Sequence, residues 1–186
     1  MTITDLDRMA AVSLTEPSTP RLRLQPAGTR YSLLDGAWWP RSTDPVAELP
    51  GLVLAIDALQ GPVTRLMLHA PAWTNRPRRL AVAGRVVRLG YFASQPPDLL
   101  IAVCGSGGAR VDLLTVPPGA PREIAETAMT RAATAGNQMH AHDIVAAATT
   151  RHRDSAKILP EDTWETEGGH LAADPRSSST PGTSTR

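Results

Sequence analysis

Two adjacent tryptophans, Trp38 and Trp39, stand between the dipeptide Asp35-Gly36 and Pro40, and this stretch constrains the fold more than any other. Asp-Gly between apolar runs is typical of a type I′ hairpin turn, although a continuous strand with a bulge at Gly36 is also open. A strand that carries both indoles should end at Pro40, because proline has no N–H for the sheet. Strand side chains alternate, so the two indoles should lie on opposite faces.

A helix is expected directly after this motif. Asp44-Pro45 combines a capping carboxylate with a proline at the first helical position, and apolar residues recur at helical spacing over 49–59. Pro50 predicts a kink or a short first turn, and Gly61-Pro62 should end the helix. A second helix is expected over Arg122–Ala135.

The other periodic segments are short and separated by turn residues, which is typical of strands. They lie at residues 21–25, 31–34, 37–39, 63–69, 80–82, 85–92, 99–104 and 111–116. The order of elements predicts an α+β fold, with a single antiparallel β-sheet of about five to seven strands and two main helices packed on one face.

The 186 residues are enough for one ordinary domain. We expect a flexible N-terminal arm over 1–20, a single α+β domain over 21–135, a short helix within 136–150 and a disordered C-terminal tail over 151–186. Both ends are rich in Ser, Thr and Pro, a composition that cannot bury enough apolar surface to offset the entropy of ordering.

Charge and hydropathy limit the classes of partner. The net charge is +1, which disfavours nucleic acid, and no apolar run is long enough to span a membrane. The N-terminus has no signal-peptide pattern, and Cys104 has no second cysteine to pair with. These features favour a cytoplasmic protein without a membrane partner, and no motif indicates a cofactor.

The motif from Asp35 to Ser42, the loop around Trp73 and the sequence Val116-Pro117-Pro118 before a helix resemble an actinobacterial domain family of unknown function. The resemblance covers about residues 21–135. It implies a single domain in a cytoplasmic actinobacterial protein. It implies no activity, substrate or cofactor, so it assigns no catalytic residue.

The leading functional hypothesis is a non-enzymatic binding domain. Its surface would lie around Trp38, Trp39, Arg41 and Trp73, and its partner would be a protein or a small molecule. The structural alternative is that the helices and the Trp73 loop bury both adjacent indoles, which is the usual fate of large aromatic side chains.

The second hypothesis is a small-molecule sensor or small enzyme with Asp35, Arg41 and His69 in one aromatic pocket. It requires that Trp38 or Trp39 is partly exposed and meets Asp35 or Arg41 at a concavity. The simpler interpretation gives Asp35 a turn role and Arg41 a structural hydrogen bond.

The third hypothesis is a weak single-stranded nucleic-acid binder. Arg76, Arg78 and Arg79 lie close to Trp73 in sequence, and arginines beside an aromatic ring can combine phosphate contacts with base stacking. Three arginines in a proline-containing loop are more often simply solvated, and the near-neutral net charge weakens the hypothesis further.

A metal site is not expected. His140 and His142 are ligand types, but residues two apart do not share a helix face. An extended loop would still need a third ligand, such as His69 or His152.

Overall fold

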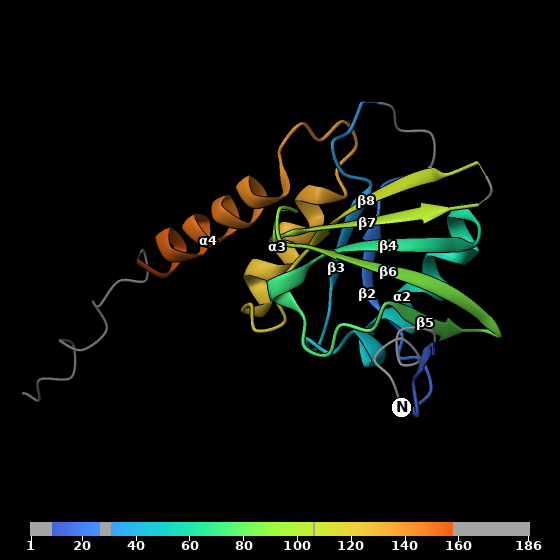
Figure 1. Ribbon diagram of the computed structural model, residues 1–186. Helices are drawn as coiled ribbons and strands as arrows, with labels where there is room; N and C mark the ends of the chain where they lie inside the picture. Colours follow the sequence, from blue (N-terminus) through green and yellow to red (C-terminus); the bar gives the residue numbers. More distant parts are fainter. Residues whose placement is uncertain (1–8, 27–30, 106, 158–186) are drawn as a thin grey trace, which may run out of the picture.

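A single sheet lies between helices on both of its faces in the computed structural model, which describes residues 9–26, 31–105 and 107–157 (Figure 1). The described elements are β1 (Ala11–Val12), β2 (Arg21–Leu24), β3 (Gly36–Trp39), α2 (Pro45–Gln60), β4 (Val63–His69), the 3-10 turn η1 (Ala70–Ala72), β5 (Arg79–Val82), β6 (Arg85–Phe92), β7 (Leu99–Cys104), β8 (Ala109–Thr115), α3 (Arg122–Ala132) and α4 (Ala141–Lys157). The α+β class is therefore confirmed.

The predicted antiparallel sheet of five to seven strands is wrong, because the described residues form an eight-stranded mixed sheet in the order β1-β5-β6-β4-β7-β8-β3-β2. Three pairs are parallel: β1 with β5, β4 with β6 and β3 with β8. Hairpin spacing fixes direction only for strands joined by a turn, such as β5–β6 and β7–β8. Because α2 carries the chain from β3 to the middle of the sheet, β3 is left to pair with a distant strand.

The prediction of a hairpin turn at Asp35-Gly36 is also wrong, and so is the alternative prediction of a bulge at Gly36. The predicted strand over 31–34 is absent, β3 begins at Gly36, and β3 pairs with β2 in a continuous antiparallel register from Leu24↔Gly36 to Arg21↔Trp39. Glycine is needed at position 36 for a different reason. A Cβ there would lie 2.1 Å from the carbonyl oxygen of Arg23, so no side chain fits between the two strands.

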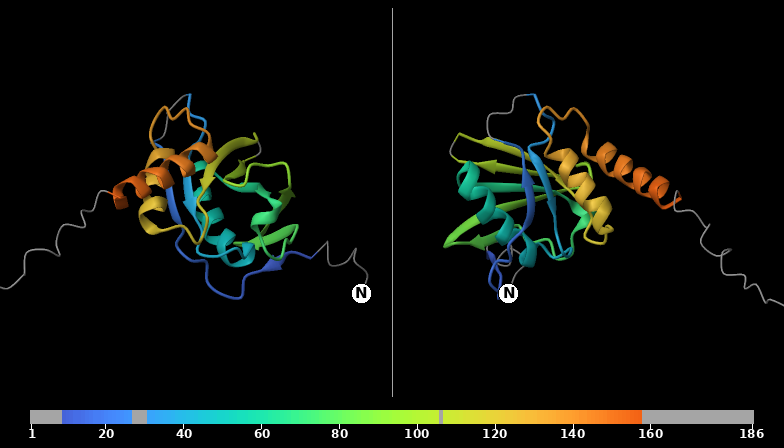
Figure 2. Two further views of the ribbon diagram at one scale, coloured as in Figure 1. Left: turned by 90° about the vertical axis from the view of Figure 1, so that its left-hand side faces the viewer. Right: turned by 180° about the vertical axis from the view of Figure 1, so that it is seen from behind.

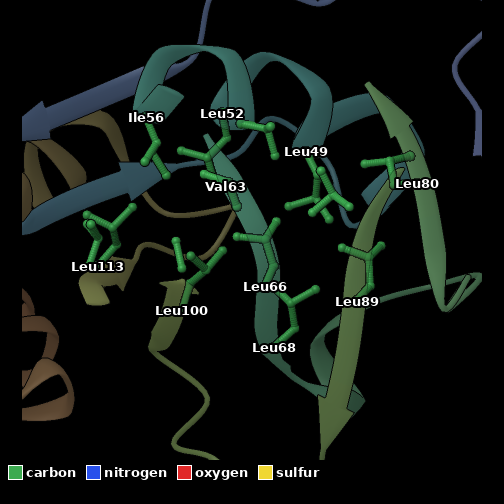
Figure 3. Packing of buried hydrophobic residues seen from close by; sticks show 14 of the residues in the cluster. Leu49, Leu52, Ile56, Val63, Leu66, Leu68, Leu80, Leu89, Leu100 and Leu113 are labelled. Carbon is green, nitrogen blue, oxygen red and sulfur yellow. The ribbon is translucent and has the colours of Figure 1, made fainter. Parts of the chain in front are cut away.

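The helices pack on both faces, whereas the sequence predicted one face only. Trp38 and Leu113 contribute to the core beneath α2, while Trp39 and Leu114, the next residues in each strand, pack toward α3 and α4. β3 and β8 therefore lie between α2 on one face of the sheet and α3 with α4 on the other (Figure 2). Figure 3 shows the side chains of Leu49, Leu52 and Ile56 on α2 facing leucines of the sheet.

The start and the end of α2 agree with the predictions made from Asp44-Pro45 and Gly61-Pro62. The Asp44 carboxylate accepts a hydrogen bond from the Val46 N–H at 3.0 Å, and the helix ends before Gly61, whose φ is 86°. Pro50 lies within one continuous helix. Farther along, α3 ends at Ala132, and α4 continues to Lys157, past the expected short helix. Among the described residues, no helix is long and apolar enough to cross a membrane.

Residues 13–20, which we call the strap, join strands at opposite edges of the sheet, β1 beside β5 and β2 beside β3. The strap runs over α2, where the Ser18 carbonyl oxygen lies 2.0 Å from the place that a Cβ on Gly51 would occupy. Arg41 Nη1 donates to the Thr19 carbonyl oxygen at 3.1 Å. Part of the expected flexible arm therefore packs on the domain. Residues 1–8 of that arm and residues 158–186 of the expected tail lie outside the described residues.

Candidate functional site

Trp38 and Trp73 belong to the core. Their rings stack with centroids 5.8 Å apart and planes 9° from parallel, and Trp38 is only 1% exposed. The backbone N–H and the side-chain hydroxyl of Thr74 both donate to the Thr43 carbonyl oxygen at 3.0 Å, which holds the Trp73 loop against the start of α2. Trp38 therefore has almost no surface to offer a partner, and Trp73, 7% exposed, lines a hollow of about 240 Å³ with Pro40 and Ser42. Trp39 is the most exposed of the three indoles.

Trp39 lies on the opposite face and is half-buried beneath Arg21. The Arg21 guanidinium carbon is 3.5 Å from the Trp39 ring centroid, a cation–π contact. Arg21 also donates from Nε to the Trp39 carbonyl oxygen at 2.9 Å and from Nη2 to the Pro40 carbonyl oxygen at 2.6 Å. Desolvation, with the nearby Arg41 charge adding to it, lowers the pKa of Arg21. Among the described residues, the buried Nε1 of Trp39 has no hydrogen-bond acceptor.

A groove of about 530 Å³ opens beside Trp39, between β2 and α3. The residues of its wall that carry charge or a large side chain are Arg21, Arg23, Trp39, Arg122, Glu126 and Met129. Arg23 Nη1 donates to the Thr130 hydroxyl at 2.6 Å, and Arg122 Nε lies 2.7 Å from Glu126 Oε1. We call this surface the Trp39 groove. Three arginines against one glutamate give it a positive potential.

The structure does not bring Asp35, Arg41 and His69 together. Asp35 Oδ2 accepts from the Asp112 backbone N–H at 2.7 Å, at the end of β3 opposite to Trp39. His69 Nδ1 lies 2.6 Å from the Gln95 carbonyl oxygen, and the Arg41 side chain reaches the strap. Each residue has its own structural partner, and none of the three lines the hollows beside Trp39, Trp73, Phe92, Arg85 or His140.

Comparison with protein families gives one result. The family DUF5994, a family of unknown function, matches residues 21–132. The chain belongs to DUF5994. The DUF5994 match runs from β2 to α3 and therefore includes every residue that lines the Trp39 groove except Pro20, while β1 and α4 lie beyond its two ends. No curated protein and no solved structure shows significant similarity to the chain.

Sequence reasoning missed the arginines of the groove in this DUF5994 domain. The pattern Arg21-Leu22-Arg23-Leu24 puts both arginines on one face of β2, and that alternation was visible. What the pattern did not show is the register, which sets Arg21 opposite Trp39 and Arg23 opposite Ala37. The arginines meet the indole only because β2 and β3 pair.

The arginine loop of the DUF5994 domain does not use Trp73, which is buried. Arg76 and Arg78 instead line a hollow of about 360 Å³ together with Gly90, Tyr91 and Phe92. Arg79 is the first residue of β5. The aromatic rings beside Arg76 and Arg78 are thus those of Tyr91 and Phe92, and Phe92 is 47% exposed.

Two other groups of the DUF5994 protein that could carry chemistry are the pair His140 and His142 and the thiol of Cys104. The rings of His140 and His142 stack with centroids 6.1 Å apart, and within the described part of the chain no three potential metal ligands gather. Cys104 is fully buried, and burial raises the pKa of its thiol, which disfavours the reactive thiolate.

Proposed function

We propose that this chain is a non-enzymatic binding domain of the cytoplasm, and that it holds a small organic anion in the Trp39 groove. The observation that carries the proposal is a half-buried indole beneath Arg21, at a groove whose wall holds three arginines and one glutamate. A volume of about 530 Å³ suits a small ligand, since such pockets span roughly 300–1,000 Å³.

The chemistry of the groove favours binding over catalysis. Among its described residues, the only carboxylate, Glu126, is bound to Arg122, and none is a cysteine, serine or histidine.

Indole N–H signals in two-dimensional NMR test the proposal. The chain has four tryptophans, and the Trp39→Phe variant identifies which signal belongs to Trp39. We expect citrate, among the probes citrate, benzoate and pyrophosphate, to shift the Trp39 signal in a saturable way and to leave those of Trp38 and Trp73 unchanged. If none of the three anions moves the Trp39 signal, the groove is not an anion site.

A pair of variants separates the groove from general charge. Arg23→Gln removes one charge from the groove wall and should weaken citrate binding several-fold. Arg151→Gln removes the same charge from an exposed position on α4 and should leave binding unchanged. Equal weakening by both variants would show that the anion responds only to net charge.

A further inference from the structure

A hollow of about 240 Å³ lies where β3 and β8 end, and its wall is drawn from the segments 40–42, 72–73, 97–98 and 115–118. We call it the β3–β8 hollow. β3 and β8 are parallel neighbours, but the chain leaves them toward opposite faces of the sheet, with α2 after β3 on one face and α3 after β8 on the other (Figure 2). Connections that diverge from the carboxyl ends of adjacent parallel strands leave a crevice, which is a frequent position of ligand sites in open sheets.

The segments that meet at the β3–β8 hollow are far apart in the sequence. Three of them belong to the motif from Asp35 to Ser42, the loop around Trp73 and the sequence Val116-Pro117-Pro118, on which the family resemblance rests. The Thr115 N–H donates to the Asp98 carbonyl oxygen at 2.8 Å, which joins the two other parts of the wall. The Trp39 groove shares no residue with this wall, so the hollow is a second, separate concavity.

Most of the wall of the β3–β8 hollow is apolar. Four of the nine residues that line it are prolines, and Ala72 and Trp73 add further apolar surface. The Trp73 ring is held in place by its stack on Trp38. Because proline has no backbone N–H, the four prolines offer carbonyl oxygens but no donors to a ligand. The wall therefore suits a ligand with an apolar body.

Asp98 is the only acidic or basic residue among those that line the hollow. It is half-buried, and desolvation raises the pKa of its carboxyl, while the nearby imidazoles of His142 and His69 act in the opposite direction. Within the described part of the chain, the Asp98 carboxylate makes no ion pair and no side-chain hydrogen bond. A carboxylate that has lost part of its water and has no partner is stabilised by a cation.

The other polar side chains of the wall agree with a ligand that donates hydrogen bonds. Ser42 donates its own proton to Glu48 Oε1 at 2.9 Å, so toward the hollow its oxygen can only accept. The Thr115 hydroxyl can accept as well. The Trp73 indole is an obligatory donor, but it is neutral and does not offset the charge of Asp98 for an incoming anion.

We propose that the β3–β8 hollow binds a small organic ammonium ion, with its apolar body against Trp73 and the prolines and its charged nitrogen at Asp98. An organic anion would be repelled by Asp98, and a neutral molecule would leave the carboxylate without a partner. A metal ion has no apolar body, and no three potential metal ligands gather among the described residues. The hollow and the Trp39 groove thus take ligands of opposite charge, so this proposal stands independently of the anion site.

Titrations with benzylammonium, benzyl alcohol and benzoate test the proposal on the full chain, because the three probes share one ring and differ in charge. The readout is the indole N–H signal of Trp73 in two-dimensional NMR, which the Trp73→Phe variant identifies. We expect benzylammonium to shift this signal with a dissociation constant of roughly 0.1–10 mM, as suits so small a probe. Benzyl alcohol should bind at least fivefold more weakly, and benzoate should leave the Trp73 signal unchanged.

A matched pair of variants separates the hollow from general charge. Asp98→Asn keeps the size of the side chain and removes its charge, so it should weaken benzylammonium binding at least fivefold and bring it close to that of benzyl alcohol. Asp154→Asn removes the same charge from an exposed position on α4 and should bind like the wild type. The Asp98→Asn variant should unfold at an equal or higher temperature, because burial disfavours the charge that it removes.

Three outcomes overturn the proposal: a Trp73 signal that benzylammonium does not move, equal affinities for benzylammonium and benzyl alcohol, or wild-type affinity in the Asp98→Asn variant. Tighter binding of a lysine-containing peptide than of benzylammonium also overturns it, because the hollow would then belong to a protein partner. The Trp39 signal reports on the groove in the same spectra, so the two sites are scored separately.

Discussion

At the scale of single residues, Trp38 and Trp39 are neighbours with different environments. Trp38 is buried against Trp73, and Trp39 is half-buried at the edge of a groove. Trp38→Ala should lower the free energy of unfolding by about 3–5 kcal/mol, the range for large aromatic side chains in a core. Trp39→Ala should lower the free energy of unfolding by a clearly smaller amount. Urea unfolding curves measure both, and equal losses would contradict this assignment of the two indoles.

A second residue-scale prediction concerns Asp35. Burial raises the pKa of its carboxyl above the ordinary 3.8, although the hydrogen bond from the Asp112 N–H acts in the opposite direction. Because the folded-state pKa is the higher one, stability is greatest below the unfolded pKa and falls as the pH rises through the folded value. Asp35→Asn keeps an acceptor but cannot ionise. Unfolding measured from about pH 3.5 to 6.5 should show a smaller decline for the variant, and an unchanged decline would exclude Asp35 as its source.

At the scale of elements, the contact between the strap and α2 predicts that a normally stabilising substitution lowers the stability of the protein. Gly→Ala inside a helix normally stabilises by about 0.5–1 kcal/mol. At Gly51 the new methyl group would meet the Ser18 carbonyl oxygen, so Gly51→Ala should destabilise the protein and loosen the strap. Gly119→Ala is the control, because its Cβ would have no neighbour within 4 Å. Thermal unfolding and proteolysis between residues 13 and 20 provide the measurements. A stabilised Gly51→Ala variant would show that the strap does not press on α2.

The elements that could be predicted from sequence are those whose determinants are local. The start of α2 depends on Asp44 and Pro45, and its end on Gly61, all within a few residues of the boundary. Strand direction and partner could not be predicted. The neighbours of β3 are β2, which ends twelve residues before the first residue of β3, and β8, which begins at Ala109. No short window of sequence contains both sides of such a pair.

The candidate site could be predicted only in part, because some of its residues come together through pairing between distant segments. Alternation along a strand was enough to place Trp38 and Trp39 on opposite faces. The groove depends on Arg21 and on α3, which approach Trp39 through pairing and packing that the sequence does not display. Asp35 and Arg41, the nearer neighbours in sequence, lie at the two ends of a four-residue strand and point to separate partners.

At the scale of the whole molecule, charge is distributed unequally: residues 9–157 contain 16 basic and 11 acidic residues, although the net charge of the chain is only +1. This distribution leads to a fourth prediction. The segment after the described residues carries an acidic run with Glu161, Asp162, Glu165 and Glu167. Replacing these four residues with their amides should strengthen citrate binding in the Trp39 groove several-fold at low salt, because it removes negative charge from the chain that carries the groove. Ser177→Ala with Ser178→Ala is the neutral control. An affinity for citrate that does not respond to the four amides would mean that these charges do not act on the Trp39 groove.

The parallel pairing of β3 with β8 also has a consequence for synthesis on the ribosome. Gly36 is translated 77 residues before its register partner Leu113. At about 5–20 residues per second, the double-tryptophan strand waits roughly 4–15 s for that partner to be made. During this interval α2 and Trp73, which are already made, can cover Trp38, whereas α3 and α4, toward which Trp39 packs, are made only after β8. A slowly translated message, or a ribosome stalled before β8, would therefore expose an aromatic strand that chaperones and aggregation compete to capture.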